Sequence, residues 1–274
     1  MENKKVAFLT LGCKVNQYET NAMIQDFIKN GYKLVEFDEK ADVYVVNTCT
    51  VTNMADRKSR QMLRKVKELN ANAILVAVGC YAQVAREDLE KIPEINLILG
   101  TNEKKDIVEY VNKMLINALE NDKKANLISV KLENGKTPSQ KNRVEEIQDV
   151  MHCEEYTEFG DVTFTEKTRA VIKVQDGCDR FCSYCIIPYA RGHIRSRKPQ
   201  SVVSEIKKIA QKGIKEVVIT GIHLTSYGRD FKGDSEYRLI DLLEEINKIE
   251  GIKRIRLRFI GANLNYRRIC SKAI

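Results

Sequence analysis

The sequence of 274 residues contains no apolar run near the roughly 18 residues that a membrane-spanning helix needs, so we expect no membrane protein. Its first residues, MENKKVAFLTLGC, turn polar too soon for a secretory signal peptide, which predicts a cytoplasmic protein. The composition, 43% hydrophobic and 31% charged, excludes collagen-like, coiled-coil and disordered chains. What remains is a globular protein of one or two domains.

Basic residues exceed acidic ones, but the excess is not spread evenly along the chain. The chain has 46 Lys and Arg against 38 Asp and Glu, a net charge of +8, which favours an anionic partner such as nucleic acid. Residues 1–250 hold 39 basic and 38 acidic side chains, whereas residues 251–274 hold seven basic and no acidic ones. The excess therefore belongs to the last residues, and a nucleic-acid site must be argued from local basic patches.

Strand-like and helical patterns alternate along the chain, which predicts an α/β fold with a parallel sheet covered on both faces. A first domain spans residues 1–120, with strands expected at 6–12, 34–37, 43–49, 73–80 and 96–100. Residues 121–165 are polar and predict a linker with one short strand near 127–132. The alternation resumes over 166–274, with strands expected at 168–177, 216–224 and 252–260 and helices at 199–212 and 238–249.

Three cysteines follow predicted strands of the first domain: Cys13, Cys49 and Cys80. In a flavodoxin-like strand order of 2-1-3-4-5, the strands before them, numbers 1, 3 and 4, are neighbours, and ligands of open parallel sheets bind beyond the carboxyl ends of strands. Three thiolates there could hold an iron–sulfur cluster with one open iron. A zinc site with an outside ligand, or three buried core cysteines, are the alternatives.

A second group of cysteines is close in sequence: Cys178, Cys182 and Cys185. The spacing CxxxCxxC matches neither common zinc pattern. The segment DGCDRFCSYCIIPYARG resembles the motif of the radical S-adenosylmethionine (SAM) superfamily, including the aromatic Tyr184 before the last cysteine. This resemblance implies a 4Fe–4S cluster on the three thiolates, with SAM on the fourth iron.

Further segments resemble the radical SAM methylthiotransferases: LTLGCKVNQYET (9–20), NTCTVTNMADRKSRQ (47–61) and VGCYAQ (78–83). The stretch GCKVNQYE is most similar to the MtaB type, which modifies N6-threonylcarbamoyladenosine in tRNA. The resemblance implies a flavodoxin-like or Rossmann-like parallel sheet domain followed by a radical SAM (β/α) half-barrel. It also implies an auxiliary 4Fe–4S cluster on Cys13, Cys49 and Cys80.

The implied reaction places a methylthio group on C2 of adenosine 37 beside the anticodon, in tRNAs of the ANN-decoding class. A reducing electron donor would start the radical chemistry at the SAM cluster, and the auxiliary cluster would deliver the sulfur species. Tyr184, Gly221 and His223 are the candidates for SAM contact; His223 as an ordinary loop histidine is the alternative.

Two basic patches are candidates for RNA contact, because phosphates require neutralisation. One lies on the expected helix 53–69 and includes Arg57, Lys58 and Arg60; the other follows the SAM motif and comprises Arg191, Arg195, Arg197 and Lys198. A solvated helix face and a charged loop are the respective alternatives.

Two rival functions stay open. One is methylthiolation of an aspartate in ribosomal protein S12, and the other is a cluster-binding fragment without activity. The second has sequence support, because the chain stops after about three barrel units, without the RNA-binding TRAM domain of its relatives. Residues 258–274, RFIGANLNYRRICSKAI, also depart from the family pattern. We therefore expect an incomplete half-barrel and a C-terminally truncated product.

Overall fold

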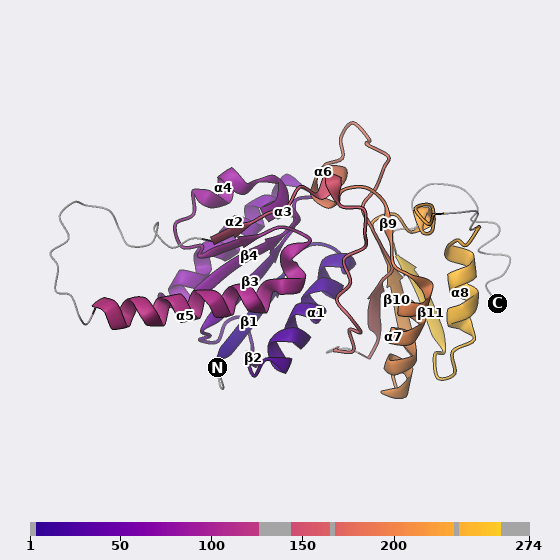
Figure 1. Ribbon diagram of the computed structural model, residues 1–274, viewed down its shortest axis with the longest axis horizontal. Helices are drawn as coiled ribbons and strands as arrows, with labels where there is room; N and C mark the ends of the chain where they lie inside the picture. The colour runs from indigo at the N-terminus through magenta and orange to yellow at the C-terminus, as the bar shows by residue number, and fades with distance from the viewer. Residues whose placement is uncertain (1–3, 126–143, 165–167, 233–235, 259–274) are drawn as a thin grey trace. The chain divides into compact units, whose positions relative to one another are not determined.

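The computed structural model describes residues 4–125, 144–164, 168–232 and 236–258 (Figure 1). The chain divides into two compact units. The first comprises residues 1–11 and 26–148, and the second comprises residues 12–25 and 149–274. The expected domains were 1–120 and 166–274, so the structure adds residues 12–25 to the second unit and parts of the expected linker to both units.

The sheet of the first unit is parallel throughout, in the order β2-β1-β3-β4-β5-β6. Its first five strands follow the expected order 2-1-3-4-5. The strands are β1 (Lys5–Thr10), β2 (Lys33–Val35), β3 (Val43–Thr48), β4 (Ile74–Gly79), β5 (Leu97–Leu99) and β6 (Val144–Glu146). β6 lies in the segment expected to be a linker, and its pairing with β5 shows that this end of the segment is structured. The strand expected near 127–132 lies outside the described residues.

Helices cover the first sheet because its strands are apolar on both faces. All six residues of β3 are buried, as a parallel strand between two helical layers requires. Leu63 and Val66 of α2 (Asn53–Leu69) pack in one core with Tyr44 and Val46 of β3. Short helices α3 (Cys80–Val84) and α4 (Arg86–Glu90) follow β4, and η1 (Glu103–Asp106) leads into α5 (Ile107–Ala125), which crosses the near side in Figure 1.

The second unit contains a three-stranded parallel sheet in the order β11-β10-β7. Its strands are β7 (Ala170–Lys173), β10 (Glu216–Thr220) and β11 (Arg254–Arg258), and a short antiparallel pair is formed by β8 (Gln175–Asp176) and β9 (Arg195–Ser196). The remaining elements are η3 (Val150–His152), α6 (Ile187–Arg191), α7 (Pro199–Gln211), η4 (Leu224–Ser226) and α8 (Leu239–Asn247). Three parallel strands with helices between them confirm the α/β architecture. The end of the expected strand 252–260 lies outside the described residues.

Both faces of this second sheet are covered. Apolar side chains of α7 and α8, such as Ile206 and Leu242, share a core with Ile172 and Ile219 of the sheet. The opposite face contributes Val171 and Val218 to a cluster with Tyr18 and Ala22 of α1 (Lys14–Lys29). Because the division between units falls inside α1, its first twelve residues form part of the second unit.

No helix in the described part of the chain combines the length and the apolar character needed to span a bilayer.

Gly79 offers a test of how tightly the ends of β3 and β4 are packed. It has φ +104°, and a Cβ atom there would lie 2.6 Å from both Asn47 Oδ1 and the Thr48 carbonyl oxygen. We expect Gly79→Ala to lower the free energy of unfolding by about 3 kcal/mol, from backbone strain plus the clash. Urea titration of the purified chain measures it.

Gly31→Ala is the matched control, because Gly31 also has a positive φ, +84°, but a Cβ atom there would meet nothing within 4 Å. It should cost only about 1 kcal/mol. Equal losses in the two variants would contradict tight packing at the strand ends.

Candidate functional site

The predicted SAM-cluster cysteines lie on one loop between β8 and α6. Cys182 is exposed, Cys178 and Cys185 are half-buried, and all three thiols are free. The Cys178 N–H donates to the Gly192 carbonyl (3.0 Å), and the Cys185 N–H donates to that of Cys182 (2.9 Å). The loop is thus closed at its base and turned at its tip, which leaves the thiols accessible.

Gly177 permits this closure. Its φ is +69°, and a Cβ atom would lie 1.8 Å from the His193 carbonyl oxygen. No other residue type fits so close to a neighbouring backbone. The glycine before the first cysteine is therefore a structural requirement of the loop.

The donor set of this loop fits an iron–sulfur cluster by its chemistry, because thiolates are the usual ligands and three free thiols share one accessible segment. Among the described residues, no three His, Cys, Asp or Glu side chains are grouped so that they could hold a metal ion as they stand. Ligation would therefore require the thiols of the loop to come together.

Tyr184 is 90% exposed, so its ring is available to a ligand. Beside it, Phe181 packs edge-to-face on Tyr189 with ring centroids 6.0 Å apart and has a positive φ of 44°, which is rare for a residue with a Cβ. Phe181 is 41% exposed and Tyr189 is 58% exposed. The cysteine loop thus carries an aromatic surface that the sequence motif indicated only at Tyr184.

Gly221 and His223, the other candidates for SAM contact, lie just after β10 and pack against Gln175. The His223 N–H donates to Gln175 Oε1 (2.7 Å), and a Cβ on Gly221 would lie 2.8 Å from the same oxygen. Gln175 Nε2 in turn donates to the Gly177 carbonyl (2.7 Å). Gln175 therefore connects the segment after β10 with the base of the cysteine loop, a role that sequence reasoning missed.

His223 is buried, and its Nδ1 lies 2.8 Å from Ser226 Oγ. Burial lowers the pKa of His223, and the nearby charges of Arg180 and Arg229 lower it further. The histidine is therefore held neutral inside the segment, unlike an ordinary exposed loop histidine.

The three strand-end cysteines follow adjacent strands of the first sheet, as expected. Cys49 follows β3 directly, Cys80 begins α3 after β4, and both are buried. Thr48 Oγ1 donates to the Val78 carbonyl (2.6 Å), which ties the two strand ends together. Cys13 follows the end of β1 by three residues and is half-buried; it belongs to the residues of the second unit.

The basic patch on α2 is accessible. The helix begins after Thr52, whose side chain accepts the Ala55 N–H (3.1 Å), and its Ser59 hydroxyl lies 3.4 Å from the Cys49 carbonyl oxygen. Arg57 and Lys58 are exposed, whereas Arg60 is half-buried and donates to Tyr81 Oη (2.5 Å). An open hollow of about 780 Å³ is lined by Arg57, Arg60, Gln61, Arg64, Lys65 and Glu68. Four cations against one carboxylate make it an anion-attracting surface.

The second basic patch was predicted wrongly for three of its four members. Arg191, Arg195 and Arg197 are at most 1% exposed, so their guanidinium groups cannot reach RNA phosphates. Arg197 instead pairs with Glu205 (2.8 Å). Only Lys198 of this patch is exposed.

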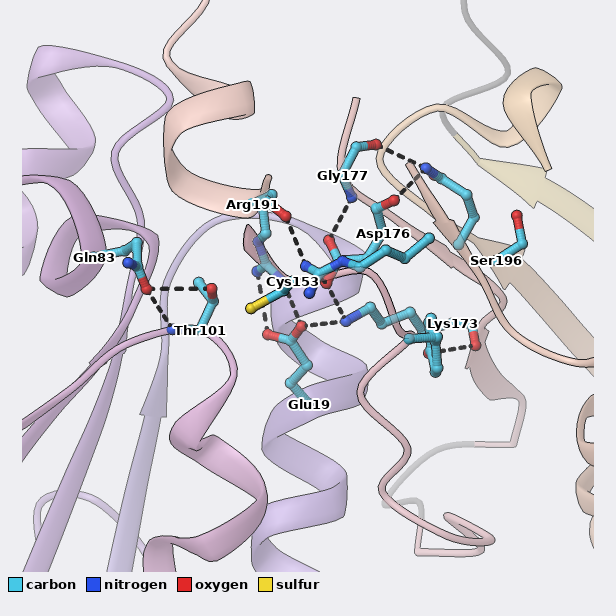
Figure 2. Close-up of polar contacts among 12 residues, drawn as sticks. Glu19, Gln83, Thr101, Cys153, Lys173, Asp176, Gly177, Arg191 and Ser196 are labelled. Carbon is cyan, nitrogen blue, oxygen red and sulfur yellow. Dashed lines mark hydrogen bonds and ion pairs between the residues drawn. The ribbon is translucent and has the colours of Figure 1, made fainter. Parts of the chain in front are cut away.

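Arg191 belongs to a network of buried charges around Glu19 (Figure 2). Lys173 Nζ lies 2.7 Å from Glu19 Oε1 and 2.6 Å from Asp176 Oδ2. Arg191 contacts both carboxylates and donates to Asn16 Oδ1 (2.6 Å). Burial alone would raise the pKa of Asp176, but the surrounding cations outweigh it and lower the pKa. One acidic partner, Glu19, comes from a helix that is distant in sequence, so local sequence did not reveal this pairing.

Comparisons with known proteins agree with these motifs. Residues 5–100 match the model of the uncharacterized protein family UPF0004, and residues 172–272 match that of the Radical SAM superfamily. The second match continues past residue 257, where we expected the resemblance to end.

Curated relatives match nearly the whole chain. The threonylcarbamoyladenosine tRNA methylthiotransferase MtaB of Bacillus subtilis is 38% identical, covering 94% of this chain and 52% of that protein. MtaB of Aquifex aeolicus is 43% identical, covering 92% and 55%. The ribosomal protein uS12 methylthiotransferase RimO of Desulfitobacterium hafniense is 36% identical, covering 94% and 53%.

The chain thus spans about half the length of the curated relatives that it matches. The first matched region contains the strand-end cysteines, and the second contains the cysteine loop. It belongs to the radical SAM methylthiotransferase family.

Proposed function

We propose that this chain carries the cluster-binding and SAM-binding part of a methylthiotransferase that acts on N6-threonylcarbamoyladenosine at position 37 of tRNA. The observation that carries the proposal is the cysteine loop, with three free and accessible thiols directly after β8. The relatives named MtaB, at 38% and 43% identity, support the choice of substrate. The reaction would take place in the cytoplasm with a reducing electron donor.

Cys178, Cys182 and Cys185 would hold a 4Fe–4S cluster together with SAM. That cofactor pair supplies radical chemistry, which can remove hydrogen from an unactivated C–H bond. The protein's own contribution is positional: Gly177 closes the loop, and Tyr184 offers an exposed ring for the adenine of SAM. Gly221 and His223, held by Gln175, would form the second edge of the SAM site.

A second 4Fe–4S cluster on Cys13, Cys49 and Cys80 is also part of the proposal. Its support is the strand order of the first sheet, in which β1, β3 and β4 are neighbours and each is followed by one of these cysteines. The bond from Thr48 to Val78 fixes two of these strand ends.

The tRNA would be bound in part by the α2 face, whose exposed cations include Arg57, Lys58, Arg64 and Lys65. Such contacts neutralise phosphates and do not depend on base sequence. Lys198 is the remaining candidate near the cysteine loop. The anticodon loop is the part of the tRNA proposed to enter the site.

Modification of ribosomal protein uS12 is the second candidate, because a relative named RimO is 36% identical over a similar span. The α2 cations do not decide between the two substrates, since ribosomal proteins function in complex with RNA. The assay must therefore present both.

The substrate is tested by anaerobic reconstitution of the chain with iron and sulfide, followed by SAM, dithionite and each substrate in parallel. We expect a mass gain of one methylthio group on the nucleoside from tRNA containing N6-threonylcarbamoyladenosine. Isopentenyladenosine tRNA and uS12 should stay unchanged. A gain on uS12 alone, or none on any substrate by a chain that binds iron and cleaves SAM, would contradict the proposal.

The SAM-cluster ligands are tested by Cys182→Ala, with Cys153→Ala as the matched control. Both cysteines belong to the second unit, but Cys153 lies outside the loop. After reconstitution, Cys182→Ala should bind about half of the wild-type iron, because one of two clusters loses a ligand. Cys153→Ala should bind the full amount. Equal iron contents in the two variants would refute the assignment.

The RNA surface is tested by Arg57→Glu/Arg64→Glu, which reverses two exposed charges on α2. Affinity for tRNA should fall by about tenfold or more, and the salt dependence of log K should flatten by about 2. Filter binding over a salt series measures both. The control Lys207→Glu/Lys215→Glu makes the same charge change on exposed residues of the second unit. An equal loss in the control would mean that only net charge matters.

A further inference from the structure

The two flanks of the cysteine loop meet the same buried carboxylate. Asp176 precedes Cys178 by two residues, and Arg191 follows Cys185 at the end of α6. Lys173 bridges Asp176 and Glu19, at 2.6 and 2.7 Å, and Arg191 contacts both carboxylates. Glu19 thus receives one cation from each side of the loop (Figure 2).

These four side chains are at most 5% exposed, which makes their arrangement specific. A buried charge is tolerated only when it is paired and hydrogen-bonded, and loss of one partner leaves the other uncompensated. The guanidinium of Arg191 donates hydrogen bonds to both Asn16 Oδ1 (2.6 Å) and Glu19 Oε2 (3.1 Å). If either flank of the loop moved, at least one of these buried polar groups would lose its hydrogen-bond or ion-pair partner.

The network reaches two cysteine segments through short chains of bonds. On one side, Asp176 Oδ1 accepts the Gly177 N–H (2.9 Å), next to Cys178. On the other, Asn16 and Glu19 lie in the first two turns of α1, where the Gln17 N–H donates to the Cys13 carbonyl (3.1 Å). All of these residues belong to the second unit.

We propose that Glu19 is a positioning residue that, through Lys173, Asp176 and Arg191, holds Cys13 and the loop Cys178–Cys185 in one fixed arrangement within the second unit. The importance of this arrangement for the reaction rests on the proposed function, in which these cysteines are ligands of two different clusters. Transfer between two reacting centres requires that their protein ligands keep a set geometry. The mechanical coupling itself is a property of the chain without any cofactor.

Hydrogen exchange of the metal-free protein, read by mass spectrometry, tests the coupling. Glu19→Gln keeps the shape of the side chain but removes its charge. We expect exchange to become about tenfold faster or more in two separate peptides, one containing Gln17 and one containing Gly177 and Cys178. Both should change together, although they are far apart in sequence.

Glu205→Gln is the matched control. Glu205 is also fully buried in the second unit, pairs with Arg197 (2.8 Å), accepts from Tyr18 of α1 (3.1 Å), and accepts the Val162 N–H (3.1 Å). This variant should accelerate exchange around Val162 and leave the Gly177–Cys178 peptide protected. A general loss of packing would instead open both regions in both variants, which would overturn the proposal.

If Glu19→Gln loses protection from hydrogen exchange throughout the chain, the milder variant Asn16→Ala provides the test of the coupling. It removes one bond to Arg191 and leaves every charge paired. Faster exchange at both reporter peptides supports the coupling, and a change at Gln17 alone overturns it. After reconstitution, the electron paramagnetic resonance spectrum of the reduced SAM cluster should shift in Glu19→Gln but not in Glu205→Gln. If the wild-type chain takes up no iron, the proposed function fails, whereas the exchange result still tests the coupling.

Discussion

The second unit depends on the neutralisation of charges that it buries. Lys173, Arg191 and Arg197 are inside the protein, and each has a carboxylate partner there. Part of this compensation comes from Glu19 on α1, a helix that begins just after the end of β1. The first residues of α1 belong to the second unit, where they supply this carboxylate together with the apolar contacts of Tyr18 and Ala22.

The general fold could be predicted because apolar alternation and strand length are local signals. The strands β1 to β5 and their order follow from such patterns, as do β7 and β10 and the helices that cover them. β6 was missed because three residues, Val144–Glu146, form a strand only by pairing with β5. The cysteine loop was located from spacing alone, and Gly177 explains why the motif begins as it does.

The role of the arginines could not be predicted in the same way. ARGHIRSRKP looks like a solvated basic loop because its own stretch contains no acid. The partners of Arg191 and Arg197 are Glu19 and Glu205, one of them more than 170 positions away in sequence. No local pattern pointed to Gln175 either, whose side chain serves the segments after β8 and β10. Long-range polar contacts are what a single sequence conceals.

Burial of these arginines changes where an RNA surface can lie. The net charge of +8 arises almost wholly from residues 251–274, so it does not mark a binding face. Of the two candidate patches, only Lys198 and the α2 cations offer charge to solvent. The hollow on α2 holds four cations against Glu68, and the helix starts a few residues beyond Cys49. A phosphate backbone attracted to that face would be guided by the first unit, whereas Arg191, Arg195 and Arg197 serve the interior of the second unit.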